Sequence, residues 1–324
     1  MYQRILVSFV TGAVCCLLAC AAGASEYPER PVTIVVAFTP GGPSDVLARV
    51  LGARLHELLG QPFVVENRPG AGGNIAAEVV ANAAPDGYTL LMGNNGILAT
   101  NVSLYKKLGY DPEKDFLPIS LIGRQANILV VNPALPANSM AELIALARSR
   151  PGQLNFASSG FGTAAHLAGE LFKTATKINI VHVAYKGAAP ALQDVVAGHV
   201  DMMFATAASA VGLIRDGKVR ALAVTTPKRT AVLPDLPTVA ELGIPGFDAA
   251  TWHGLVAPAG TSNEVIGTLN FATVAALNDP AVRTSLMELG VDIVGSTPKE
   301  FDAYIKAEIP KWADVVKASG ANLE

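Results

Sequence analysis

The stretch at residues 155–172 constrains the fold most strongly, because it has the pattern of a strand, a tight turn and a helix start. An apolar run at 154–157 breaks into two hydroxyl side chains and two glycines, and apolar residues then recur at helical spacing after Thr163. Such a turn presents free backbone N–H groups at the positive end of a helix dipole, and Ser158, Ser159 and Thr163 add hydroxyl donors. The stretch therefore predicts an anion-binding turn.

This turn does not match the better-known phosphate and nucleotide motifs. Gly160 and Gly162 fit the spacing of the dinucleotide fingerprint, but the next strand ends without the acidic residue that binds a ribose. A Walker loop needs lysine after its last glycine, where Thr163 stands. A nucleophile elbow needs glycine two places before its serine, where Phe156 stands. A plain strand-to-helix connection is the remaining alternative.

Composition bounds the classes of protein to which the chain can belong. At 324 residues it exceeds what one hydrophobic core usually fills, so two domains are expected. Hydrophobic residues make up 51% of the chain, yet no run of about 18 apolar residues occurs outside the N-terminal segment. The chain has 24 Lys and Arg residues against 27 Asp and Glu residues, and it contains no basic block. No nucleic-acid partner is therefore expected. The 5 histidines lack metal-ligand spacing, and neither a metal nor another cofactor is predicted.

Residues 1–24 are typical of an export signal, with Arg4 before an apolar segment and a small-residue cleavage site before Ser25. The mature protein is therefore expected in the periplasm. Residues 17–20 also fit a lipoprotein box, in which cleavage would leave a lipid-anchored Cys20. All three cysteines lie in this segment, so either cleavage leaves a body without disulfides.

Strand-like and helix-like patterns alternate along the rest of the chain. A continuous apolar run at 32–38 leads into a second glycine turn at 39–45, and helical spacing follows from Val46. Such alternation predicts parallel sheets with helices on both faces. Ligands bind beyond the carboxyl ends of the strands in such sheets, where Asn95 and Thr206 also follow strand patterns.

The mature chain also carries spaced motifs, among them Pro40-Gly41-Gly42-x-x-Asp45, Glu66-Asn67-x-x-Gly70-Ala-Gly-Gly73-Asn74, Asp86-Gly87-Tyr88-Thr89, Tyr185-Lys-Gly187 and Gly198-x-Val-Asp201. Together with the stretch at 157–167, they resemble the Bug family, the TctC-like extracytoplasmic solute-binding proteins of tripartite tricarboxylate transporters. The resemblance covers essentially the whole mature chain. It departs at Ala37-Phe38-Thr39-Pro40, where many relatives have Pro-Phe-Pro-Pro, so the ligand is not inherited from any one relative.

The resemblance implies an α/β fold of the periplasmic binding protein, or Venus-flytrap, type II-like class, with mostly parallel sheets and a cleft between two domains. We expect domain 1 at 25–123 plus 250–324 and domain 2 at 124–249, with the hinge at the crossings near 123–124 and 248–251. The implied function is capture of a small carboxylate, without enzymatic activity, and its delivery to the membrane permease subunits of a transporter. The protein is expected to be a monomer.

The predicted ligand site joins the two glycine turns. One carboxylate is expected at Ser158, Ser159, Gly160 and Thr163 of domain 2. The other end of the ligand, or its waters, is expected at Thr39, Gly41 and Gly42 of domain 1. The wall is completed by Asn95, Tyr185, Asp201 and Thr206. Two of these residues have a structural role as the alternative: Asp201 could be a cap, and Tyr185 could be part of the core packing. His166 is interpreted as a packed core histidine.

Two other classes of function remain as alternatives at this point. A sensory binding protein, whose closed form docks on a signalling receptor, would have the same cleft. An exported hydrolase would need an activated nucleophile, for which the sequence offers a triad of Ser158, Asp201 and His253.

Overall fold

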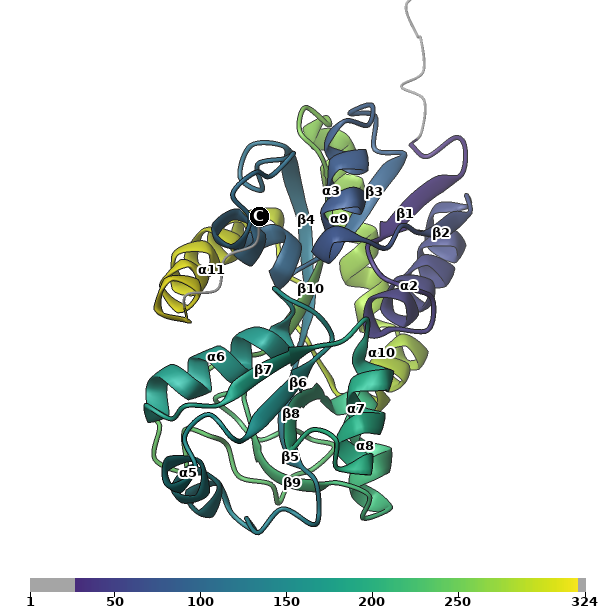
Figure 1. Ribbon diagram of the computed structural model, residues 1–324. Helices are drawn as coiled ribbons and strands as arrows, with labels where there is room; N and C mark the ends of the chain where they lie inside the picture. The colour runs from purple at the N-terminus through teal and green to yellow at the C-terminus, as the bar shows by residue number, and fades with distance from the viewer. Residues whose placement is uncertain (1–26, 320–324) are drawn as a thin grey trace, which may run out of the picture.

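The computed structural model describes residues 27–319, so the predicted export signal and Cys20 lie outside the described part of the chain. The described residues form two α/β lobes, one above the other in Figure 1. Within them, no helix is both long and apolar enough to cross a membrane. The expected two-domain α/β architecture is confirmed.

The first lobe, uppermost in Figure 1, is built on a six-stranded sheet in the order β11-β4-β10-β3-β1-β2. Its strands are β1 (Val32–Val36), β2 (Phe63–Asn67), β3 (Thr89–Asn94), β4 (Phe116–Gln125), β10 (Thr251–Pro258) and β11 (Val291–Ile293). Its helical segments are α2 (Pro43–Leu59), η1 (Ala71–Gly73), α3 (Asn74–Ala81), η2 (Gly96–Thr100), α4 (Asn101–Leu104), α9 (Asn263–Asn278), α10 (Pro280–Glu288) and α11 (Pro298–Ser319).

Helices cover both faces of this sheet, which explains why β1 is apolar at every position except Thr33. Ile34 packs in a core with residues of α2, α9 and α10, whereas Val35 faces the opposite core with residues of α3, η2 and α11. Successive side chains of a strand point to opposite faces, so a sheet that is covered on both sides needs apolar residues at every position.

The second lobe is built on a five-stranded sheet in the order β7-β6-β8-β5-β9. Its strands are β5 (Asn127–Val131), β6 (Asn155–Ser158), β7 (Val181–Ala184), β8 (Met202–Thr206) and β9 (Arg220–Val224). Its helices are α5 (Met140–Ser149), α6 (Ala164–Thr176), α7 (Ala188–Ala197) and α8 (Ala207–Arg215). Residues of α7 and α8 pack on one face with Val130, and residues of α5 and α6 pack on the other with Leu129.

Both sheets are mixed, whereas the sequence led us to expect mostly parallel ones. Strands β1, β2 and β3 are parallel, as are β6, β7 and β8. Strands β4, β10, β5 and β9 pair antiparallel with their neighbours. The difference arises because the chain passes from one lobe to the other and back, and each passage places a reversed strand in the sheet that it enters.

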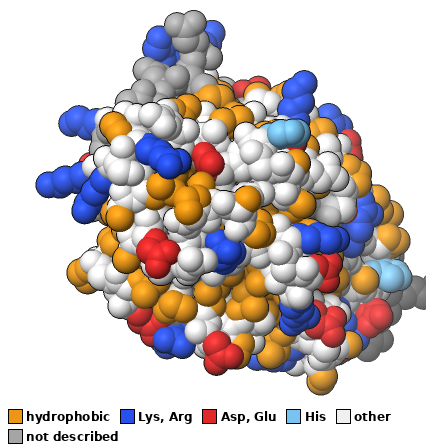
Figure 2. Space-filling model, turned by 60° about the horizontal axis from the view of Figure 1, so that its bottom comes forward, with side chains coloured by type: hydrophobic (Ala, Val, Ile, Leu, Met, Phe, Trp, Pro, Cys, Tyr) orange, Lys and Arg blue, Asp and Glu red, His pale blue; other side chains and the backbone are white. Residues whose placement is uncertain are grey.

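The face shown in Figure 2 has the lower side of the molecule turned forward. Lys and Arg side chains are interspersed there with Asp and Glu and with scattered hydrophobic side chains. A nucleic-acid-binding surface usually gathers Lys and Arg on one face, and this face has no such continuous area.

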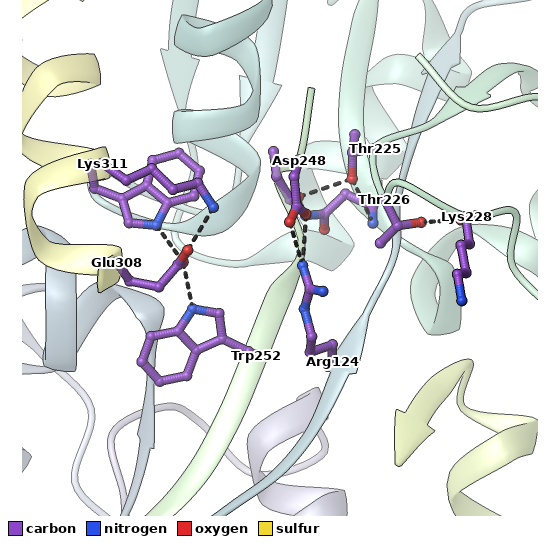
Figure 3. Close-up of polar contacts among 11 residues, drawn as sticks. Arg124, Thr225, Thr226, Lys228, Asp248, Trp252, Glu308 and Lys311 are labelled. Carbon is purple, nitrogen blue, oxygen red and sulfur yellow. Dashed lines mark hydrogen bonds and ion pairs between the residues drawn. The ribbon is translucent and has the colours of Figure 1, made fainter. Parts of the chain in front are cut away.

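The chain crosses between the lobes at 125–127, where β4 ends and β5 begins, and at 249–251, ahead of β10. An ion pair joins the two crossings, because Arg124 Nη2 lies 2.6 Å from Asp248 Oδ2 (Figure 3). Asn127 Nδ2 also donates to the Ala249 carbonyl at 2.8 Å. We call this region the lobe boundary. The domain limits expected at 123/124 and 249/250 lie close to it and stay predictions.

Helix α11 also links the lobes, since it packs against η2 and α4 of the first lobe and against α6 of the second. A buried carboxylate secures it. Glu308 accepts hydrogen bonds from Trp252 Nε1 at 2.9 Å and Trp312 Nε1 at 2.8 Å, and it pairs with Lys311 Nζ at 2.6 Å (Figure 3). Both indole rings are fully buried, so this one acceptor satisfies two donors that water cannot reach.

Replacing Glu308 with leucine should lower the free energy of unfolding by about 2–4 kcal/mol, because two buried indole N–H groups lose their acceptor. Glu308→Gln keeps an acceptor oxygen and should lose less. The matched control is Asp302→Asn, which breaks an exposed pair with Lys306 on the same helix and should change stability by no more than about 0.5 kcal/mol. Urea unfolding of the three variants measures this. A Glu308→Leu protein as stable as the wild type would contradict the assignment.

Candidate functional site

The strand registers bring both glycine turns to the lobe boundary. Asn94, at the carboxyl end of β3, pairs with His253, near the start of β10. Thr206, at the carboxyl end of β8, pairs with Asn127, the first residue of β5. Because β1 is parallel to β3 and β6 is parallel to β8, the turns that follow β1 and β6 lie at the same boundary. The sequence prediction placed the ligand at this junction.

The turn between β1 and α2 is partly occupied by a carboxylate of the protein itself. Asp45 is buried, and its Oδ2 accepts the Gly41 N–H at 2.9 Å, while Arg49 and Asn67 bind the same carboxylate. Burial raises the pKa of Asp45, but the hydrogen bonds from Arg49, Gly41 and Asn67 outweigh it and hold the pKa below its usual value. The Gly41 amide, expected to face the ligand, is therefore engaged within the turn. Of the three residues predicted in this turn, Thr39, which is exposed, and Gly42, which is half-buried, remain as candidates to face a ligand.

The turn between β6 and α6 uses most of its hydroxyl groups internally. Ser158 Oγ lies 2.7 Å from His182 Nε2 and accepts the Gly160 N–H at 3.1 Å. Thr163 Oγ1 donates to the Gly160 carbonyl at 2.7 Å. These two side chains, expected as ligand donors, therefore shape the turn. Ser159 is half-buried, and no contact to its hydroxyl is found among the described residues.

The helices that begin at the lobe boundary lack side-chain caps. Four such helices, α2, α6, α7 and α8, have an N-cap residue whose side chain makes no capping hydrogen bond. These N-cap residues are, in the same order, Gly42, Thr163, Gly187 and Thr206. Helices α5, α9 and α10 begin elsewhere and are capped by Ser139, Ser262 and Asp279, whereas α3 and α4, which begin after Gly73 and Thr100, also lack a side-chain cap. The first N–H groups of a helix need an acceptor. The boundary thus gathers donors for which the protein supplies no side-chain acceptor.

The end of β3 touches the second turn and joins the two lobes at this point. A methyl group on Gly96 would lie 3.4 Å from the Gly162 carbonyl oxygen, and one on Gly162 would lie 2.8 Å from Leu104 Cδ2. Beside this contact, Asn95 is almost fully buried. Its Nδ2 has no hydrogen-bond partner among the described residues, so Asn95 offers a donor here.

Asp201 does not lie with the other predicted site residues. It precedes β8 at the amino end, about 16 Å along the strand from Thr206. Its Oδ2 accepts the Asn155 N–H at 2.8 Å, and its own N–H donates to Asn155 Oδ1 at 3.0 Å. The residue ties the starts of β6 and β8 together, which is a structural role but not the helix or loop cap that was the alternative. The hydrolase triad of Ser158, Asp201 and His253, which the sequence offered as an alternative, is therefore wrong.

The structure places Tyr185 and Thr206 at the boundary but engages their hydroxyl groups. Tyr185 OH donates to Asp194 Oδ2 at 2.6 Å, and the Tyr185 N–H donates to the Ser158 carbonyl at 3.0 Å. Burial and the neighbouring Asp194 raise the pKa of Tyr185 to about 12. Thr206 Oγ1 is hydrogen-bonded to Ser209 Oγ. Both residues border the site without offering a free hydroxyl.

Three histidines are functional candidates, of which His166 and His253 are buried and His182 is half-buried, and the sequence pattern had singled out only His166 and His253. His253 Nε2 lies 2.8 Å from Ser44 Oγ, His182 binds Ser158, and the rings of His166 and His182 are 4.2 Å apart. Burial lowers the pKa of His253 and His182 to about 4 and that of His166 to about 3. Their apolar neighbours in sequence were the only available signal, and that signal led us to interpret His166 as a core residue.

The described residues contain no group of three or more His, Cys, Asp or Glu side chains that could hold a metal ion. The arrangement at the lobe boundary is instead one of uncapped amide groups and neutral polar side chains. Such a set can bind an anion or a neutral acceptor through hydrogen bonds.

Acidification should destabilise the protein through these histidines. Their folded pKa values lie below the unfolded value of about 6.5, so the unfolded chain binds more protons between pH 6.5 and about 4, and stability falls as pH is lowered through this window. When the pH is lowered from 7 to 5, the free energy of unfolding of His253→Gln, measured in urea, should fall by about 1–2 kcal/mol less than that of the wild type. Exposed His56→Gln is the control and should match the wild type. Equal losses in all three proteins would refute this role of His253.

The comparisons with known proteins agree with this geometry. Residues 47–321 match the family described as "Tripartite tricarboxylate transporter family receptor". Protein BugT of Bordetella pertussis is 40% identical over 308 residues, which cover 95% of this chain and 94% of the relative.

Solved structures show the same likeness. R. palustris Rpa4515 with adipate is 44% identical, with a TM-score of 0.86 over 91% of this chain and 99% of that one. MatC (Rpa3494) from Rhodopseudomonas palustris with bound malate is 39% identical, with a TM-score of 0.83 over 90% of this chain and 100% of that one. The resemblance to the Bug family is confirmed, and the chain is a binding protein and not an enzyme. It belongs to the tripartite tricarboxylate transporter receptor family of periplasmic solute-binding proteins.

Proposed function

We propose that this protein captures a small dicarboxylate between its lobes in the periplasm and delivers it to the membrane permease subunits of a tripartite transporter. The observation that carries the proposal is the set of uncapped helix N-termini at the lobe boundary, set against the capped helices elsewhere. Helix N-termini bind carboxylates through free N–H groups and the helix dipole.

The proposed ligand has two acceptor groups, because donors come from both lobes. In the second lobe, the first turn of α6 offers backbone N–H groups beside Ser159. In the first lobe, Asn95 offers a buried Nδ2 without a partner among the described residues, beside Gly42 and Thr39. The relatives with adipate and with malate each hold an acid with two carboxylates, which supports this class.

The first turn contributes less positive potential than the second. Asp45 already takes the Gly41 amide, and Arg49 balances its charge, with Arg49 Nη2 2.9 Å from Asp45 Oδ1. A second carboxylate close to Asp45 would be repelled unless water or a neutral donor separated the two. We therefore place one carboxylate directly at α6 and the other end of the ligand at Asn95 and the waters near Gly42.

Adipate or malate should raise the melting temperature and reduce the radius of gyration in small-angle scattering. A ligand that bridges the lobes stabilises the closed form by RT ln(1 + [L]/Kd), about 2.7 kcal/mol at a hundredfold excess over Kd. Adipamide is the matched control, since it has the shape of adipate without the charge, and it should have little effect. A higher melting temperature without compaction would contradict bridging. No response to either acid would contradict the proposed ligand class.

Gly42→Val should weaken the binding of adipate or malate about tenfold or more while leaving the fold intact. Gly42 has an ordinary φ of −77°, and a methyl group there would meet only the Thr39 carbonyl, at 3.5 Å. The side chain fits the fold but covers the approach to the turn. Calorimetry gives the affinity, and urea unfolding should show a change within about 0.5 kcal/mol. Gly267→Val, at an exposed helical glycine with open space around it, controls for the added side chain. Unchanged affinity in Gly42→Val would remove this turn from the site.

A further inference from the structure

A hydrogen bond between a serine and a histidine supports each of the two glycine turns. Ser44, in the first turn of α2, has its Oγ 2.8 Å from Nε2 of His253 on β10. Ser158, at the end of β6, has its Oγ 2.7 Å from Nε2 of His182 on β7. Both serines are buried, His253 is buried and His182 is half-buried. In each lobe, a serine of the turn is hydrogen-bonded to an imidazole from another strand of the same sheet, β10 in the first lobe and β7, which is adjacent to β6, in the second.

The second turn carries a further histidine. His166 Nδ1 accepts the Gly162 N–H at 3.2 Å. Its ring lies 4.2 Å from that of His182, and Phe161 meets both rings edge-on, at 5.5 and 5.0 Å. The amides of both glycines in this turn are thus held, that of Gly160 through Ser158 and that of Gly162 by His166.

The contact of His166 requires a neutral imidazole. A ring nitrogen that accepts an N–H must keep its lone pair, so His166 cannot carry a proton at Nδ1 while it binds Gly162. His182 is stacked on Phe156 at 4.9 Å, and the nearest cation acting on it is Lys173, which also disfavours a charged ring.

We propose that His253, His182 and His166 are positioning residues of the ligand site. Through their hydrogen bonds to Ser44, Ser158 and Gly162 they hold the two glycine turns in the shape that leaves the helix N–H groups of the lobe boundary unpaired and available to a carboxylate. The inference rests on the proposed function, since it assigns these turns to the ligand. None of the three histidines needs to touch the ligand, yet affinity should depend on them.

The test compares ligand affinity and stability in matched variants of the purified protein. His182→Leu removes the hydrogen bond to Ser158 and should weaken adipate or malate binding about tenfold, the loss expected for one buried hydrogen bond. His182→Gln, which can place an amide nitrogen near the Nε2 position, should recover most of the affinity. Ser158→Ala should lower the affinity as much as His182→Leu does. The double variant should bind no more weakly than the weaker-binding single variant, because the two residues act as one unit.

His56→Leu, at an exposed position in the last turn of α2, is the control and should bind like the wild type. Urea unfolding of each variant separates loss of affinity from loss of folded protein. If His182→Leu is too unstable to measure, Ser158→Ala and His182→Gln still test the unit. Wild-type affinity in Ser158→Ala and His182→Leu would overturn the proposal.

A second readout needs no ligand. Amide hydrogen exchange of Gly162 should become about tenfold faster in His166→Leu than in the wild type, while exchange in β8 stays unchanged. Equal Gly162 exchange in the two proteins would overturn the role of His166. If the wild type binds neither adipate nor malate, the proposed ligand class fails, whereas the exchange measurement still decides whether the histidine holds the turn.

Discussion

Backbone N–H groups at helix N-termini must find an acceptor, and the lobe boundary depends on this constraint. Four helices begin there without side-chain caps, and α3 and α4 also lack them, whereas α5, α9 and α10 carry serine or aspartate caps. A buried unpaired donor is costly. In the function that we propose, the ligand supplies the missing acceptor, since a small carboxylate satisfies both the hydrogen bonding and the dipole.

The fold serves this arrangement by bringing strand ends together. Reversed strands at the two crossings turn the carboxyl ends of β1, β3, β6 and β8 toward one boundary. The pair of Arg124 and Asp248 ties the crossings, and α11 adds a third link between the lobes, anchored by Glu308. Because these links join the lobes and do not reach the turns, the shape of each turn depends on local contacts, chiefly those of the three histidines.

Much of the fold could be predicted from the sequence, because apolar runs and helical spacing report burial directly. The strands and helices that flank both glycine turns were available in this way, whereas the two lobes were expected from the chain length and from the resemblance to the Bug family. The use of individual polar groups could not be predicted. Spacing cannot show that Asp45 folds back onto the Gly41 amide, nor that Asp201 pairs with Asn155 on another strand. Pairing of Ser44 with His253 joins residues that are distant in the chain, so it has no local signature.

A crystal structure of the protein grown with adipate tests the central claim most directly. The account predicts one carboxylate within about 3.2 Å of backbone N–H groups in the first turn of α6, with the other end of the molecule contacting the first lobe. Adipate held entirely by one lobe, or bound away from the start of α6, would contradict it.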